Sequence, residues 1–379
     1  MAGIYIHIPF CKKLCFYCDF YHTISYSSDD ISALINALTK EALLRHDYTG
    51  TETISTIYLG GGTPSVFSVK ELATLFSQIH KLFRVEENCE ITIELNPDDV
   101  DPIYLDGLRK LKINRISLGV QSWRDQDLKI LNRRHDSAQA ATALREIFES
   151  GLENVSIDLI YGIPGMSIGD WSSNLDFSFS FDIKHLSAYH LTFEPKTVFG
   201  KKLEKGHISE IDEDESALQF TKLIEKTESA GFIHYEISNF CKPGYISIHN
   251  SNYWKQVNYL GLGPSAHSFN GYSRQWNISD VKGYIKAVNS GKSFFNKEEL
   301  DIRDRFNEYI MTSLRTMWGI DLEYIETSFG KESHDYIVNL AEKFKNYGMV
   351  NQDKNSLILT NQGKMISDNI ISEFMMPGD

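Results

Sequence analysis

This sequence contains few cysteines, no long apolar run and no basic leader. Only 5 of the 379 residues are cysteine, too few for the disulfide framework of a small secreted domain. No apolar run approaches the ~18–20 residues that cross a bilayer. The first ten residues, MAGIYIHIPF, lack the basic segment and small-residue cleavage site of a secretory signal. We therefore expect a cytoplasmic protein without a membrane span.

Positive charge is also in deficit, because 38 Lys and Arg face 51 Asp and Glu, a net charge of −13. Such a surface disfavours non-specific binding to nucleic acid, whose phosphates need Lys and Arg contacts. It disfavours an anionic membrane surface for the same reason. A length of 379 residues exceeds the ~250–300 that one hydrophobic core usually reaches. We therefore expect one large domain and a smaller one.

Between residues 4 and 236, short β-branched runs alternate with segments of helical periodicity. The runs look nearly all apolar, which is typical of parallel strands covered on both faces. The predicted strands are Ile4–Ile8, Ile54–Leu59, Glu90–Leu95, Arg115–Val120, Val155–Ile160, His185–Leu191 and Phe232–Ile237. The predicted helices are Ile31–Leu44, Val69–Phe83 after a capping box of Ser68 and Glu71, and Ala138–Ser150 and Glu213–Ala230, closed by Gly151 and Gly231.

These successive strand–helix units predict an α/β fold with a parallel sheet and right-handed crossovers. The units are too few for a complete eight-fold barrel. A partial barrel and an open doubly wound sheet both fit the pattern. In either fold, the working site should lie at the C-terminal ends of the strands.

The alternation of strand and helix patterns ends after residue 236. We interpret 1–236 as the main domain and 237–300 as an aromatic-rich connecting region that completes its core. In 301–379, helices at 303–316, 332–346 and 361–375 and a hairpin at Met349–Leu359 predict a small winged-helix-like domain. This segment carries 8 Lys and Arg against 13 Asp and Glu, so we expect a docking or lid domain rather than a DNA-binding one.

Three of the cysteines, Cys11, Cys15 and Cys18, follow the first strand with the spacing C-x3-C-x2-C. Three thiolates on one short loop can hold three corners of a cubane iron–sulfur cluster. The fourth iron is then open to a substrate or cofactor. A zinc site completed by His22 and a chance group of buried thiols are the alternatives. The spacing favours iron–sulfur over zinc, and the clustering argues against chance.

The stretch from Tyr5 to Phe20, YIHIPFCKKLCFYCDF, resembles the signature of radical S-adenosylmethionine (SAM) enzymes, and within them the oxygen-independent coproporphyrinogen oxidase group. The resemblance spans nearly the whole chain. It implies a partial (β/α)6 TIM-like barrel, a [4Fe-4S] cluster on the three cysteines, and SAM chelated to the open iron. The further matching motifs are GGGTP at 60–64, ELNP at 94–97, GVQS at 119–122, NR at 132–133, DLIYGIPG at 158–165, YEISN at 235–239 and HNSNYW at 249–254.

The resemblance also implies which residues contact SAM. Glycines after the second strand let backbone groups approach the ligand closely. Arg133 is suited to pair with a carboxylate, although its neighbour Arg134 could take that place. Asp158 lies in an apolar run, where an unpaired acid is costly, so it should meet a cation or hydrogen-bond donors. The implied contacts are Tyr5, Tyr17, Gly61, Gly62, Thr63, Glu94, Gln121, Arg133 and Asp158.

Two branches of this group imply different functions. In the oxidase, a fourth cysteine stands where this chain has Phe20, and an extension precedes the signature, which here begins at Tyr5. HemW-type proteins have C-x3-C-x2-C-D-F and H-N-x-x-Y-W, as this chain does. That branch implies a heme chaperone, which binds heme and delivers it to heme-accepting proteins such as membrane respiratory enzymes. The alternative is an enzyme that oxidatively decarboxylates coproporphyrinogen III.

The segment from His249 to Trp254 is the candidate heme contact. Imidazole is a good axial iron ligand, and the neighbouring Tyr253 and Trp254 offer flat faces for a porphyrin. A lone histidine in an aromatic loop is more often a packed or hydrogen-bonded residue. With the resemblance, we predict that His249 contacts heme, and His267 is the rival ligand.

Overall fold

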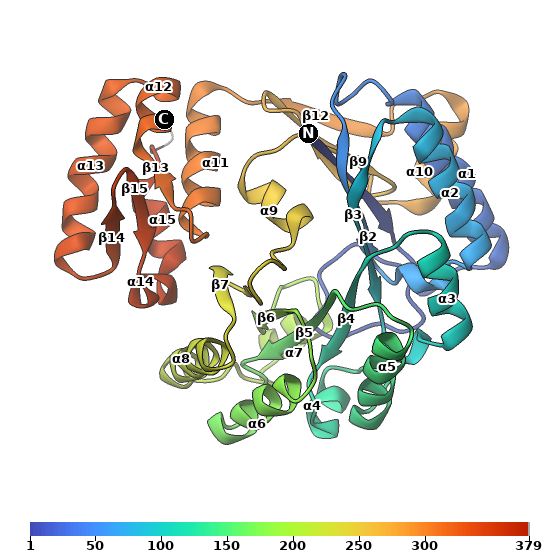
Figure 1. Ribbon diagram of the computed structural model, residues 1–379, viewed down its shortest axis with the longest axis horizontal. Coiled ribbons are helices and arrows are strands. Elements are labelled where there is room, and N and C mark those ends of the chain that lie inside the picture. Colours follow the sequence, from blue (N-terminus) through green and yellow to red (C-terminus); the bar gives the residue numbers. More distant parts are fainter. Residues whose placement is uncertain (378–379) are drawn as a thin grey trace.

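The computed structural model describes residues 1–377, and its largest element is a sheet of twelve strands (Figure 1). Its order is β12-β11-β10-β9-β1-β2-β3-β4-β5-β6-β8-β7, so within the described residues the sheet has two free ends and does not close into a barrel. The parallel strands are β9 (Tyr259–Leu262), β1 (Ala2–Ile8), β2 (Ile54–Gly61), β3 (Val85–Leu95), β4 (Arg115–Gln121), β5 (Val155–Tyr161) and β6 (His185–His190). The antiparallel strands are β7 (Ile233–Glu236), β8 (Asn239–Cys241), β10 (His267–Phe269), β11 (Ser273–Asn277) and β12 (Phe295–Glu299).

Helices connect the parallel strands and lie on the outer side of the curved sheet (Figure 1). The predicted capping box of Ser68 and Glu71 is present, and Gly151 and Gly231 have the expected positive φ, at 86° and 74°. No helix within residues 1–377 is both long and apolar enough to cross a membrane. The helices are α1 (Ser28–Leu44), α2 (Val69–Leu82), α3 (Pro102–Lys110), α4 (Asp125–Ile130), α5 (Ser137–Glu149), α6 (Ile168–Phe179), α7 (Val198–Glu204) and α8 (Glu213–Ser229), with short 3-10 turns η1 (Pro64–Val66) and η2 (Pro97–Asp99).

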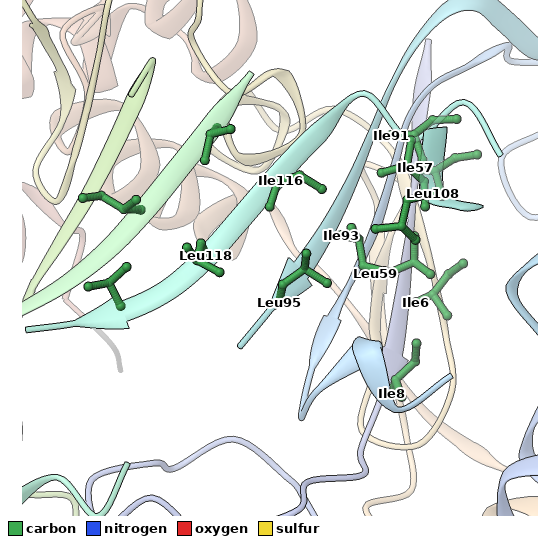
Figure 2. Close-up of a cluster of buried hydrophobic side chains, with 14 of the residues drawn as sticks. Ile6, Ile8, Ile57, Leu59, Ile91, Ile93, Leu95, Leu108, Ile116 and Leu118 are labelled. Carbon is green, nitrogen blue, oxygen red and sulfur yellow. The ribbon is translucent and has the colours of Figure 1, made fainter. Parts of the chain in front are cut away.

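The hydrophobic core lies between this sheet and its helices. Figure 2 shows side chains such as Ile6, Leu59 and Ile93, all fully buried on the helix-facing side of the strands. The expectation of nearly all-apolar strands was wrong, because the alternate residues of the same strands are polar. Successive side chains of a strand point to opposite faces. The inner face therefore presents Tyr58, Glu94, Ser117, Asp158 and Ser187 to a cavity.

Residues 237–300 extend this sheet rather than forming a loop region. Strand β9 pairs in parallel with β1 and brings β10, β11 and β12 with it as an antiparallel extension. Helices α9 (Ile248–Trp254) and α10 (Val281–Ser290) also lie here, and neither was predicted. These strands are only three to five residues long, too short for a clear alternation of apolar and polar residues.

A second hydrophobic cluster, from Phe306 to Phe374, forms the smaller C-terminal domain. It is winged-helix-like, as predicted, with a three-stranded sheet of order β13-β15-β14. The segment 361–375 is two helices rather than one, because the backbone breaks at Ile366, and helix α12 was not predicted. The elements are α11 (Ile302–Leu314), β13 (Ile320–Asp321), α12 (Leu322–Phe329), α13 (Lys331–Asn346), β14 (Val350–Asp353), β15 (Ser356–Leu359), α14 (Asn361–Met365) and α15 (Ser367–Phe374).

Candidate functional site

A cavity of about 740 Å³ lies at the C-terminal ends of the parallel strands. It has the position that a parallel α/β fold favours for a binding site. Three groups of residues line it, from the cysteine loop, the strand ends and the C-terminal domain. They include Cys11, Cys15, Tyr17, Cys18, Phe20, His22, Tyr58, Gly61, Gly62, Thr63, Glu94, Asn96, Gln121, Arg133, Asp158, Tyr189, Arg315, Ser367 and Asp368.

The cysteine loop between β1 and α1 is fixed by backbone contacts rather than by a helix or strand of its own. The N–H of Cys11 donates to the carbonyl of Thr23 at 3.0 Å, and that of Phe16 to Leu131 at 3.2 Å. The amide of Asn132 donates to the Leu14 carbonyl at 2.7 Å. These bonds tie the loop to the segment after α4, so all three thiols face one cavity.

The three cysteines are free thiols in this arrangement. Burial raises the pKa of Cys11, and it raises that of Cys18 to about 12. A coordinated metal removes such protons outright, so these thiols fit ligands that ionise on binding. Within residues 1–377, no three His, Cys, Asp or Glu side chains converge on a point where a single metal ion could bind. Cys18 Sγ lies 4.0 Å from His22 Nδ1. An iron–sulfur cluster would take each of the three thiolates on a different iron.

Two carboxylates face the cavity opposite the thiols. Glu94 accepts hydrogen bonds from the Tyr58 hydroxyl at 2.8 Å and from the Gly61 N–H at 3.2 Å. Asp158 accepts from the Ser117 hydroxyl at 3.2 Å. Burial raises the pKa of Glu94 to about 7 and that of Asp158 to about 6. A cationic ligand in the cavity would lower both pKa values and favour the ionised carboxylates.

Arg133 reaches the cysteine loop from the segment after α4. Its guanidinium donates to Cys15 Sγ at 3.3 Å, to the Asn96 side-chain oxygen at 2.5 Å and to the Gly119 carbonyl at 2.8 Å. The neighbouring Arg134 pairs instead with Asp98 and Asp99. Of the two arginines, Arg133 is therefore the one that lies beside the thiols.

The other predicted SAM contacts divide into those that line the cavity and one that does not. Tyr17, Gln121, Gly61, Gly62 and Thr63 line it, and Gln121 ends β4 with a φ of 68°, a strained value for a residue other than glycine. A Cβ on Gly62 would lie 2.8 Å from backbone oxygens of the first strand and the cysteine loop, so only glycine fits there. Tyr5 lies outside the lining, with its hydroxyl 3.1 Å from His7 Nδ1.

The structure places His249 away from the cavity that the cysteines face. The side chain is buried outside the cavity lining, and both ring nitrogens already have partners. Its Nδ1 lies 2.8 Å from the Thr56 hydroxyl, and its Nε2 lies 3.0 Å from the Tyr253 hydroxyl. Burial lowers the pKa of this histidine to about 3. The residue is a packed, hydrogen-bonded histidine, as a lone histidine in an aromatic loop usually is. The rival His267 is exposed and stacks on Trp276.

Several cavity residues were missed from the sequence. Tyr58 alternates with the buried Leu59 on β2, and that period of two was a signal that could have found it. Asn96 lies in the quoted ELNP motif but received no role. Arg315 and Asp368 come from the C-terminal domain and form an ion pair at 3.3 Å. No local pattern predicts that a distant domain will close the cavity.

Comparisons with known proteins find a separate family match for each of the two domains. Residues 5–177 match the radical SAM superfamily, and residues 300–366 match the HemN C-terminal domain. The chain is 31% identical over 377 residues to the heme chaperone HemW of Bacillus subtilis, covering 99% of each chain. It is 36% identical over 330 residues to the heme chaperone HemW of Synechocystis, covering 84% of this chain and 79% of that one.

A solved structure of the coproporphyrinogen III oxidase HemN from Escherichia coli, a radical SAM enzyme, has the same fold. The TM-score is 0.86 at 23% sequence identity, and the alignment covers 99% of this chain and 90% of that chain. At this identity the likeness describes the fold and not the reaction.

Proposed function

The chain belongs to the HemW family of the radical SAM superfamily, and from this premise we propose that it is a heme chaperone. On this proposal it binds a [4Fe-4S] cluster, SAM and heme, and passes the heme to acceptor proteins. The observation that carries the proposal is similarity along almost the entire chain to proteins that bear the heme chaperone name.

The cavity residues fit a cluster and SAM. Cys11, Cys15 and Cys18 would each hold one iron. Glu94 and Asp158, whose pKa values are raised by burial, would gain a cationic partner from the amino or sulfonium group of SAM. Arg133 would meet the carboxylate of SAM. When bound, the cluster supplies a single electron to the sulfonium of SAM.

Within the cavity, His22 offers the imidazole for heme iron that His249 does not. Its Nδ1 donates to the Phe20 carbonyl at 2.7 Å, which leaves a lone pair on Nε2. Metal-binding histidines commonly fix their tautomer through such a bond to a backbone carbonyl. Phe20 also lines the cavity and is 71% exposed, so its ring is available to a flat apolar ligand. The other cavity imidazole, His190, has its Nε2 packed against Gly162.

Phe20 also argues against the oxidase alternative. A phenyl ring can neither donate a proton nor bind iron, and the position is occupied by cysteine in the oxidase branch. The likeness to HemN supports the shared fold only.

The C-terminal domain is proposed to control access to the cavity. Arg315, Ser367 and Asp368 line the cavity, and Arg315 pairs with Glu236 of the main domain at 3.5 Å and with Asp368 at 3.3 Å. The partition into 1–236, 237–300 and 301–379 remains a proposal, as do the cytoplasmic location and the heme-accepting partners. Heme-accepting proteins should dock near the C-terminal residues that line the cavity, Arg315, Ser367 and Asp368.

The test uses full-length protein reconstituted anaerobically with iron and sulfide and titrated with heme. Heme should bind with one-to-one stoichiometry, and coproporphyrinogen III should give no protoporphyrinogen IX in the presence of SAM and reductant. His22→Ala should change the heme absorption band. His46→Ala is the matched control, because His46 also bonds a backbone carbonyl, at 2.9 Å, but lies outside the cavity. Absence of heme binding, or robust porphyrinogen turnover, would contradict the proposal.

A further inference from the structure

A chain of hydrogen bonds links the sulfur atoms of two cluster cysteines through three other side chains. The Thr63 hydroxyl donates to Cys11 Sγ at 3.5 Å. The Asn96 amide donates to the Thr63 hydroxyl at 3.1 Å, and the Asn96 oxygen accepts from Arg133 at 2.5 Å. The second branch of the Arg133 guanidinium donates to Cys15 Sγ at 3.3 Å.

The direction of every bond in this chain is fixed by chemistry. The Asn96 NH2 group can only donate, so it occupies a lone pair of the Thr63 hydroxyl. The hydroxyl proton is then directed at the sulfur of Cys11. The Asn96 oxygen can only accept, so together with the Gly119 carbonyl it holds one branch of the Arg133 fork while the other branch points at Cys15. One asparagine therefore contacts both of the donors that point at the two sulfurs.

The position of Asn96 in the chain supports this role. It precedes the 3-10 turn η2, where an asparagine side chain would ordinarily cap the turn by accepting from a backbone N–H. Here the side chain makes no capping bond. Its amide instead spans from Thr63, at the end of β2, to Arg133, beyond α4. Thr63 is buried, which limits the other partners that its hydroxyl can find.

We infer that Asn96 is a positioning residue that sets the reduction potential of the cluster. Hydrogen bonds to cluster sulfurs stabilise the reduced, more negative state and so raise the potential. Without Asn96, the Thr63 hydroxyl loses the donor that directs its proton at Cys11, whereas the Arg133 guanidinium keeps the Gly119 carbonyl as a partner. The inference rests on the cluster-binding part of the proposed function and does not depend on heme.

The test is an anaerobic redox titration of the SAM-free, reconstituted full-length protein, followed by electron paramagnetic resonance. In Asn96→Ala, the ratio of reduced to oxidised cluster at the wild-type midpoint should fall about tenfold, equivalent to a shift of about −59 mV for one electron. Thr63→Val, which keeps the shape but removes the hydroxyl, should shift the midpoint in the same direction. Thr63→Ser should restore it.

Asn114→Ala is the matched control. Asn114 bonds the backbone at Ile91 and Cys89 and lies outside the cavity lining, so its loss should leave the midpoint unchanged. If Asn96→Ala does not retain iron, the Thr63→Val and Thr63→Ser pair decides the question. An unchanged midpoint in Asn96→Ala with full iron content, or in Thr63→Val, would overturn the inference. Failure of the wild-type protein to assemble a cluster would instead contradict the proposed function.

Discussion

Replacing Glu94 by Gln should abolish most of the pH dependence of SAM binding. Burial, together with the nearby carboxylate of Asp158, raises the pKa of Glu94 to about 7. A pKa above the ordinary range means that the acid is largely protonated below pH 7 and ionised above it. Because a cationic ligand binds the ionised form, affinity should fall as the pH falls through 7.

The magnitude follows from the ionised fraction. With a pKa of about 7, Glu94 is about 90% ionised at pH 8 and about 10% ionised at pH 6, a loss of roughly tenfold in affinity, or about 1.4 kcal/mol. Asp158, with a pKa of about 6, adds a smaller loss over the same range. Glu94→Gln keeps the acceptor for the Tyr58 hydroxyl but cannot ionise, so it should bind SAM weakly with a flatter pH profile.

Anaerobic calorimetric titration of cluster-loaded protein with SAM at pH 6, 7 and 8 measures this directly. The comparison between wild type and Glu94→Gln cancels the titration of SAM itself. Equal pH slopes in the two proteins would refute the reasoning, because they would show that Glu94 is not the group that titrates. An unchanged affinity at pH 8 would remove Glu94 from the SAM site.

Three further predictions concern the cluster, SAM and His249. Anaerobically purified protein should hold about four irons per chain, and Cys15→Ala should lose them, measured as iron and sulfide content; one zinc and no sulfide in the wild type would exclude the cluster. Arg133→Ala should weaken SAM binding at least tenfold in the same calorimetric assay, since a charge-assisted pair to the carboxylate is lost. His249→Ala should lower the free energy of unfolding by about 2–5 kcal/mol, because the Thr56 and Tyr253 hydroxyls lose their buried partner. Denaturant unfolding measures that change, and the folded variant should still bind heme; loss of the heme absorption band with unchanged stability would restore His249 as a ligand.

The sequence predicted the successive strand–helix units because strands such as β1 carry closely spaced, buried β-branched residues, here Ile4, Ile6 and Ile8. The cysteine spacing likewise identified the loop that faces the cavity. The apolar residues alone did not reveal that the inner face of the sheet is polar. On β5, however, the polar residues Ser156 and Asp158 alternate with apolar ones, and this alternation can be read from the sequence.

What escaped prediction depends on contacts between distant segments. The role of Asn96 requires Thr63 and Arg133 to meet in space. The position of His249 outside the cavity depends on its contact with Thr56, a residue of β2. The closure of the cavity by Arg315 depends on how a second domain docks. Such long-range contacts leave no periodic signal in the local sequence.

The most direct test of the heme chaperone proposal is the kinetics of heme transfer. Heme-loaded, cluster-containing protein is mixed with the apo form of a heme-requiring acceptor, and the rate is followed as the acceptor concentration is raised. Apomyoglobin, which captures released heme, provides the passive reference. If the chain delivers heme through protein contacts, the transfer rate should rise with acceptor concentration and exceed the passive rate. A rate that is independent of acceptor concentration and equal to the apomyoglobin rate would contradict it.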